Sequence, residues 1–236
     1  MVEYACIKKR EIKMKKFKCI VLDHDDTSVK STPEIHYPSF LETLDVLRPG
    51  TTYSYDEFIK LVSDPGFYKL CREICGFDDE EMKVEYRLWR EYVRTHTPDF
   101  YDGIPQFIER LKADGVLICV VSHSLSEMIV RDYNHSNVPL PDMIFGAEYP
   151  EEQQKPSVYP LKKIMETYSL SPDDILVIDD LKPGYEMAKK VGVHFAYAGW
   201  AATRLPEIDE FMNSHGVPIL SLEDLKSSML PSDIEK

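Results

Sequence analysis

Short apolar runs that end abruptly in polar residues recur along the chain. The clearest three are FKCIVL at 17–22, VLICVV at 116–121 and ILVI at 175–178. Runs this short and this rich in β-branched residues are typical of buried β-strands. Three weaker runs predict further strands at 143–146, 193–198 and 218–221.

Amphipathic helical patterns separate the predicted strands. Residues 103–114 place Ile104, Phe107, Ile108 and Leu111 on one face, and similar patterns cover 160–168 and 183–191. Ser124 and Glu127 have the spacing of a capping box for a helix that runs through Tyr133. Strands that alternate with helices predict right-handed βαβ units. The expected fold class is therefore α/β, with a Rossmann-like parallel sheet covered by helices on both faces.

Residues 31–99 interrupt this alternation, because they show helical patterns and no strand. Four helices are expected, the second beginning at a Ser54/Glu57 capping box and the last carrying Met82, Tyr86, Trp89 and Val93 inward. The first carries Phe40, Leu41, Leu44 and Leu47, and the third carries Phe67, Leu70, Cys71 and Ile74. The chain is therefore divided into an α/β core (17–30 and 100–236) and an inserted all-helical domain (31–99). Residues 1–16 are basic and are expected to form a poorly ordered extension.

Composition and charge exclude several classes of function. The net charge of −13 argues against nucleic-acid binding, which needs a basic face, so any phosphate site must be made positive locally. The five cysteines show no zinc spacing and no even disulfide set. No signal peptide or membrane-spanning run is recognised, so a cytoplasmic protein that does not bind membranes is expected. No protein partner is predicted.

Polar side chains follow three of the predicted strands. Asp23 and Asp25 follow the first, Ser122 the second, and the pair Asp179 and Asp180 the third. The carboxyl ends of parallel strands meet at one edge of a sheet, where open α/β sheets bind ligands. Four carboxylates brought together there would repel one another unless the fold held them apart or a divalent cation lay among them. All-oxygen ligands suit a hard cation, so Mg2+ is the expected cofactor.

The spacing Asp23-x-Asp25 fits phosphoryl transfer. One carboxylate can attack phosphorus to form an aspartyl phosphate, while the other protonates the departing alcohol and then deprotonates water. The backbone N–H of His24 lies between them. Ser122 and Lys155 can supply a hydroxyl and an ammonium group for the phosphoryl oxygens.

These motifs resemble those of the haloacid dehalogenase-like superfamily, and the resemblance covers the chain from Phe17 to about Leu225. The four motifs occur in order: Asp23-x-Asp25-x-Thr27, Ser122, Lys155-Pro156 and the pair Asp179-Asp180. The likeness is to the phosphoglycolate phosphatase and β-phosphoglucomutase branch. It implies that the helical insertion is a C1-type cap that closes over the substrate.

The resemblance also implies roles for individual residues. Asp23 would be the nucleophile, Asp25 the acid and base, and Lys155 a bridge between the nucleophile and the phosphoryl group. Magnesium would be held by the Asp23 carboxylate, the Asp25 carbonyl and Asp180. Asp179 would contribute through a water molecule or by contacting one of these ligands.

Two positions depart from the family pattern. Asp26 stands where Gly is frequent. Gly184 stands where a further Asp is frequent, so whether Asp179 or Asp180 contacts the ion directly is left open.

Four more residues are candidates for substrate contacts. His24 and His123 lie in the predicted strand-end loops, although for His24 the use of the backbone alone is the favoured interpretation. Phe67 and Tyr68 follow the loop Ser63–Gly66, which could enter the active site or could be an ordinary helix–helix turn.

The function expected from the sequence is a magnesium-dependent phosphomonoesterase that acts on a small phosphorylated metabolite. The acid at Asp25 argues against dehalogenation, because a halide leaving group needs no proton. A β-phosphoglucomutase-like phosphomutase and a catalytically idle relative that binds phosphate ligands are the alternatives.

Overall fold

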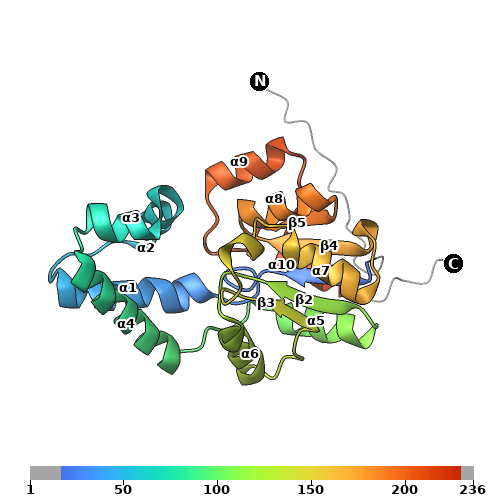
Figure 1. The fold of residues 1–236 in the computed structure, drawn as a ribbon, viewed down its shortest axis with the longest axis horizontal. Coiled ribbons are helices and arrows are strands. Elements are labelled where there is room, and N and C mark those ends of the chain that lie inside the picture. The colour runs from blue at the N-terminus through green and yellow to red at the C-terminus, as the bar shows by residue number, and fades with distance from the viewer. Residues whose placement is uncertain (1–16, 230–236) are drawn as a thin grey trace.

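A six-stranded, fully parallel sheet forms the centre of the α/β part of the molecule (Figure 1). The computed structural model describes residues 17–229. The strand order is β3-β2-β1-β4-β5-β6, all neighbours being parallel. The strands are β1 (Cys19–Leu22), β2 (Leu117–Val121), β3 (Met143–Phe145), β4 (Ile175–Asp179), β5 (His194–Ala198) and β6 (Ile219–Leu220). All six predicted strands and the α/β fold class are confirmed, whereas the predicted extension 1–16 lies outside the described residues.

Alternate residues of the central strands pack on the two faces of the sheet. In β1, Ile20 and Leu22 belong to one buried apolar cluster, while Cys19 and Val21 belong to another. Helices α5 (Ile104–Ala113), α6 (Ser126–His135) and α10 (Leu222–Met229) contribute to the first cluster. Helices α7 (Tyr159–Tyr168) and α8 (Lys182–Val191) contribute to the second. A strand buried on both faces cannot alternate apolar with polar residues, which is why β1, β2 and β4 are continuously apolar.

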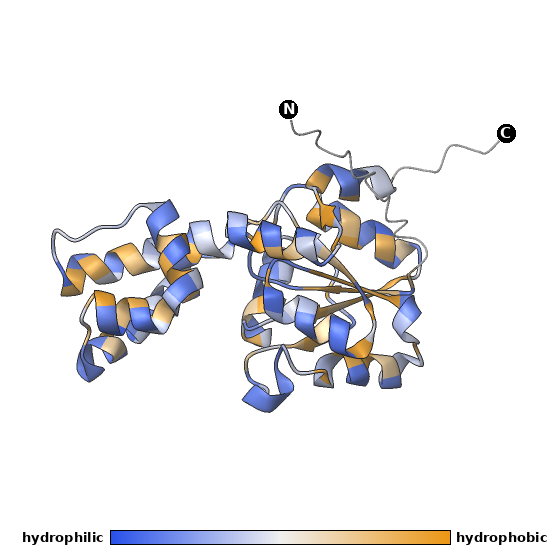
Figure 2. Cartoon of the chain, turned by 90° about the horizontal axis from the view of Figure 1, so that it is seen from above, coloured by the Kyte–Doolittle hydropathy of each residue, from blue (hydrophilic) through white to orange (hydrophobic). Residues whose placement is uncertain are grey.

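The helices between β1 and α5 lie to one side of the sheet rather than on either of its faces (Figures 1 and 2). We refer to residues 32–95 as the helical insertion. It contains π-helical segments η2 (Thr32–His36), η3 (Val62–Gly66) and η4 (Leu70–Ile74) and helices α1 (Tyr37–Leu47), α2 (Tyr55–Leu61), α3 (Phe67–Lys69) and α4 (Asp79–Thr95). The division of the chain into domains at 30/31 and 99/100 stays a prediction.

The sequence pattern of the helical insertion was only partly predictive. The Ser54/Glu57 capping box is present. Tyr86, however, is 58% exposed, so the prediction that it faces inward is wrong. Ile74, which belongs to the apolar pattern of the third predicted helix, is 45% exposed. Ile74 lies at the end of the π-helical segment η4, whose wider turn shifts the phase of a 3.6-residue pattern. Tyr86 lies on the flank of α4 and contacts Trp89, with ring centroids 5.8 Å apart.

One further prediction about a helix needs correction, and two helices were not predicted. The expected Ser124/Glu127 capping box does not form, because α6 begins at Ser126 with Leu125 as its N-cap. The hydroxyl of Ser124 instead donates to Asp25. Helices α9 (Pro206–Ser214) and α10 were not predicted. Among residues 17–229, no helix combines the length and the apolar character needed to span a bilayer.

Candidate active site

The carboxyl ends of β1 and β4 bring three carboxylates and one ammonium group together. Asp23 continues from β1, and its N–H donates to the carbonyl of Ile178 in β4 at 2.9 Å. Lys155 lies in the loop before α7, and its Nζ is 2.8 Å from Asp23 Oδ1 and 2.6 Å from Asp179 Oδ2. The lysine therefore bridges a carboxylate from each strand, and all three residues are buried.

Asp23, Asp179 and Asp180 form a buried carboxylate cluster. One oxygen of each carboxylate lies within 4.8 Å of the others. Burial, opposed by the Lys155 charge and reinforced by Asp179 and Asp25, raises the pKa of Asp23 to about 6. Burial and the charges of Asp23 and Asp179 raise the pKa of Asp180 well above its ordinary value. One lysine cannot neutralise three carboxylates, so a hard divalent cation with oxygen ligands fits this donor set.

Two threonines orient Asp180. Thr27 Oγ1 donates to Asp180 Oδ1 at 3.0 Å, and Thr203 Oγ1 donates to Oδ2 at 2.7 Å. Thr27 belongs to the predicted motif, whereas Thr203 follows β5 and carries no signal in the sequence.

Asp179 accepts a backbone hydrogen bond, and its carboxylate occupies the space where residue 184 has no side chain. Its Oδ1 accepts from the N–H of Leu181 at 2.8 Å. A Cβ atom at Gly184 would lie only 2.2 Å from Asp179 Oδ2. The departure from the family pattern at Gly184 therefore makes room for the Asp179 carboxylate.

Asp25 faces the helical insertion and two serines. Its Oδ2 accepts from Ser124 Oγ at 2.6 Å and from Ser122 Oγ at 3.4 Å, and its Oδ1 lies 4.0 Å from His36 Nε2. Burial raises the pKa of Asp25, but the charges of His24 and His36 and the hydrogen bond from Ser124 outweigh it, so the pKa falls below its ordinary value.

Ser124 and His36 were missed by the reasoning from sequence. Ser124 was assigned to a helix cap instead, and His36 lies in the helical insertion, 11 positions after Asp25 in the printed sequence. The ring of His36 stacks on Trp89 and its Nδ1 accepts from Trp89 Nε1 at 3.4 Å. This bond leaves the Nε2 edge of His36 directed at Asp25.

Asp26 occupies a turn and not the carboxylate cluster. Its φ of 55° lies in the left-handed region, which Gly adopts freely and Asp tolerates better than most residues. Its Oδ1 accepts from the backbone N–H of Thr32 at 3.2 Å, next to η2. Burial raises the pKa of Asp26 to about 7. The aspartate thus joins the loop after β1 to the start of the helical insertion.

The two candidate histidines contact different parts of the core. His24 is buried, and its Nε2 is 3.0 Å from Asp132 Oδ2 on α6. Its side chain therefore connects the loop after β1 to α6. His123 is exposed, and its Nε2–H donates to the carbonyl of Lys155 at 3.0 Å. His123 therefore touches the backbone of the bridging lysine.

The structure does not bring the two aromatic candidates to the carboxylate cluster. Phe67 packs edge-on against Phe40 within the helical insertion, with centroids 6.0 Å apart. Tyr68 is 66% exposed. Neither side chain is a hydrogen-bond or ion-pair partner of the cluster, and their predicted substrate contacts remain a prediction.

Comparison with known proteins gives consistent matches over most of the chain. A phosphoglycolate phosphatase of Aquifex aeolicus (strain VF5) is 27% identical over 209 residues, which are 87% of this chain and 96% of that protein. Pyrophosphatase PpaX of Halalkalibacterium halodurans is 23% identical over 185 residues, covering 77% of this chain and 83% of that protein. A crystal structure described as a predicted phosphoglycolate phosphatase from Haemophilus somnus 129PT superposes with a TM-score of 0.74 at 18% identity, covering 92% of this chain and all of that one.

The family model for haloacid dehalogenase-like hydrolases matches residues 20–198. This segment contains all four motifs and every residue of the carboxylate cluster. The matched range is well over half of the chain, so the predicted family and enzyme class are confirmed: this protein belongs to the haloacid dehalogenase-like hydrolases.

Proposed function

We propose that the protein is a magnesium-dependent phosphatase that hydrolyses a small phosphorylated metabolite through an aspartyl phosphate on Asp23. The observation that carries the proposal is the buried Asp23–Lys155–Asp179 bridge beside Asp180. The phosphoglycolate phosphatase and pyrophosphatase relatives support this class of substrate.

Asp23 supplies the nucleophile. A carboxylate oxygen of Asp23 attacks phosphorus, the bond from phosphorus to the ester oxygen breaks, and the phosphoryl group is carried on the aspartate. Lys155 holds one oxygen of Asp23 and thereby orients the other toward the substrate. Because the ammonium group is buried, its charge acts on the phosphoryl oxygens with little screening by water.

Asp25 transfers the protons. It donates one to the departing alcohol oxygen and later accepts one from the water that attacks the phosphorus of the aspartyl phosphate, so the enzyme returns to its starting state. Ser124 and Ser122 hold Oδ2 of this carboxylate, and His36 faces Oδ1. These contacts hold the Asp25 carboxylate between two serines of the core and a histidine of the helical insertion.

The Asp23 and Asp180 carboxylates and the Asp25 carbonyl are proposed to hold Mg2+, with Asp179 acting through water. The ion supplies positive charge that offsets the charge of the phosphoryl group and of the cluster. Thr27 and Thr203 keep Asp180 in position for this task. The helical insertion is proposed to act as the cap that excludes water and selects the substrate.

The proposal is tested by the turnover of p-nitrophenyl phosphate. We expect activity with Mg2+, its loss in EDTA, and at least about a thousandfold lower kcat in Asp23→Asn, because the amide is not a nucleophile. Asp45→Asn is the matched control, since Asp45 is exposed on α1. Turnover in EDTA, or near-normal activity in Asp23→Asn, would refute the mechanism. Absence of turnover on any phosphate ester would favour a binding protein without activity.

A further inference from the structure

Residues 200–203, which lie between β5 and α9, contact the carboxylate cluster by two routes (Figure 1). We refer to them as the β5–α9 loop. Thr203 Oγ1 donates to Asp180 Oδ2 at 2.7 Å. Trp200 Nε1 donates to the carbonyl of Thr27 at 2.9 Å, and Thr27 Oγ1 donates to Asp180 Oδ1 at 3.0 Å. Both oxygens of Asp180 therefore depend on this loop, one directly and the other through Thr27.

Two tyrosines hold the main chain of the β5–α9 loop at Ala202. The N–H of Ala202 donates to Oη of Tyr101 at 2.9 Å, and Tyr101 is buried just before α5. The carbonyl of Ala202 accepts from Oη of Tyr55 at 3.3 Å. Tyr55 is the first residue of α2 and belongs to the helical insertion. Because Ala202 directly precedes Thr203, a shift in either contact also moves the hydroxyl that holds Asp180.

Contacts within the helical insertion fix the position of Tyr55. The Ser54/Glu57 capping box sets the start of α2. The ring of Tyr55 packs edge-on against that of Tyr37, at the start of α1, with centroids 5.3 Å apart. The insertion therefore carries the Tyr55 hydroxyl to the β5–α9 loop. At 3.3 Å this contact is longer than most O–H···O hydrogen bonds, so a small movement of the insertion would strengthen it or break it.

We propose that Tyr55 is a positioning residue for the proposed metal ligand Asp180. Acting through the β5–α9 loop, it makes the cation affinity of the carboxylate cluster depend on the placement of the helical insertion. This inference rests on the metal site of the proposed function. Removing a group that orients a metal ligand typically costs about ten- to a hundredfold in affinity for the ion. Because such coupling is reciprocal, the bound cation also favours the arrangement in which Tyr55 contacts the loop.

Thermal unfolding over a range of Mg2+ concentrations gives the Kd of the ion without any turnover. Thr203→Val loses the hydroxyl that holds Asp180 and is expected to raise Kd about tenfold. Tyr55→Phe keeps the ring, loses the contact with Ala202 and is expected to raise Kd about fivefold, as one hydrogen bond predicts. Tyr37→Phe is the matched control, because its hydroxyl donates to the carbonyl of Tyr53 within the insertion, and its Kd should equal that of wild type.

A double variant tests the route from Tyr55 to Asp180. In a Thr203→Val background, Tyr55→Phe should raise Kd by much less than it does alone. Equal increases in both backgrounds would overturn the inference, as would a wild type whose Tm does not respond to Mg2+. A purely structural role of Tyr55 would lower Tm in EDTA and leave Kd unchanged, which would also contradict it.

Phosphate release from p-nitrophenyl phosphate separates this inference from the proposed function. Tyr55→Phe should need several times more Mg2+ for half-maximal activity, as its higher Kd requires, and added Mg2+ should restore most of kcat. A Kd that depends on Tyr55 in a protein without turnover would support the inference and contradict the proposed function. Normal turnover with the same Kd in wild type and Tyr55→Phe would contradict the inference alone.

Discussion

Gly184 influences the candidate site through the side chain that it lacks. It belongs to the first turn of α8, and the Asp179 carboxylate fills the space where its side chain would lie. The same carboxylate accepts a hydrogen bond from Lys155 at 2.6 Å. A substituent at residue 184 must therefore move Asp179, and with it the ammonium group that holds Asp23.

Gly184→Ala is expected to lower kcat/KM for p-nitrophenyl phosphate by at least about tenfold. Cβ would approach Asp179 Oδ2 to 2.2 Å, far inside van der Waals contact, and a small displacement of catalytic groups is costly. The concentration of Mg2+ needed for half-maximal activity should rise as well. Glu186→Ala, an exposed position on the same helix, serves as the control. Wild-type kinetics in Gly184→Ala would show that Asp179 has no influence on the reaction.

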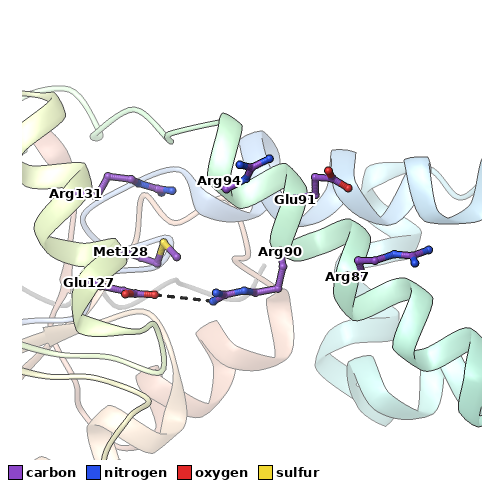
Figure 3. A pocket seen from close by; sticks show the side chains of 7 residues that line it. All are labelled: Arg87, Arg90, Glu91, Arg94, Glu127, Met128 and Arg131. Atoms are coloured by element: carbon purple, nitrogen blue, oxygen red, sulfur yellow. Dashed lines mark ion pairs between the residues drawn. The ribbon is translucent and has the colours of Figure 1, made fainter.

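At the scale of single elements, α4 has two different faces. One face packs inward with Val93 and the partly buried Met82, while another carries the exposed Arg87, Arg90 and Arg94 (Figure 3). The inner face also buries Glu85, which makes no hydrogen bond or ion pair within the described residues 17–229. Burial raises the pKa of Glu85 from 4.5 to about 7. The helix is therefore predicted to lose stability when this carboxyl ionises.

Glu85→Gln is expected to stabilise the protein at pH 8 and not at pH 4.5. The folded state binds the Glu85 proton more tightly than the unfolded state, so its stability declines as pH rises from about 4.5 through about 7. The neutral amide removes this loss, and a gain of about 1 kcal/mol corresponds to a rise in Tm of about 2–4 °C. Thermal unfolding at both pH values checks this, with the exposed Glu186→Gln as control. An equal change in Tm at both pH values would contradict it.

At the scale of the whole molecule, the folded chain concentrates negative charge at one edge of its sheet. The net charge is −13, and three buried carboxylates share one lysine there. Folding without a cation must overcome both their repulsion and their loss of hydration. A metal that binds only the folded state therefore stabilises the whole molecule.

Mg2+ at a hundred times its Kd is expected to stabilise the folded protein by about 2.7 kcal/mol. This gain corresponds to a rise in Tm of about 5–10 °C, which thermal unfolding with and without Mg2+ measures. In EDTA, Asp180→Asn should unfold at a temperature about 2–4 °C higher than wild type, because one buried charge is removed. The same variant should lose most of its response to Mg2+. An undiminished response in Asp180→Asn would exclude Asp180 as a ligand.

The sequence by itself determined the strands, most core helices and the residues of the carboxylate cluster. Those features depend on local periodicity and on residues at strand ends, which parallel pairing carries to one edge. Only the tertiary structure decided that Ser124 holds Asp25, that Thr203 holds Asp180 and that His24 pairs with Asp132. These partners are separated by 99, 23 and 108 positions. Contacts over such separations depend on strand register and helix packing, which no local pattern encodes.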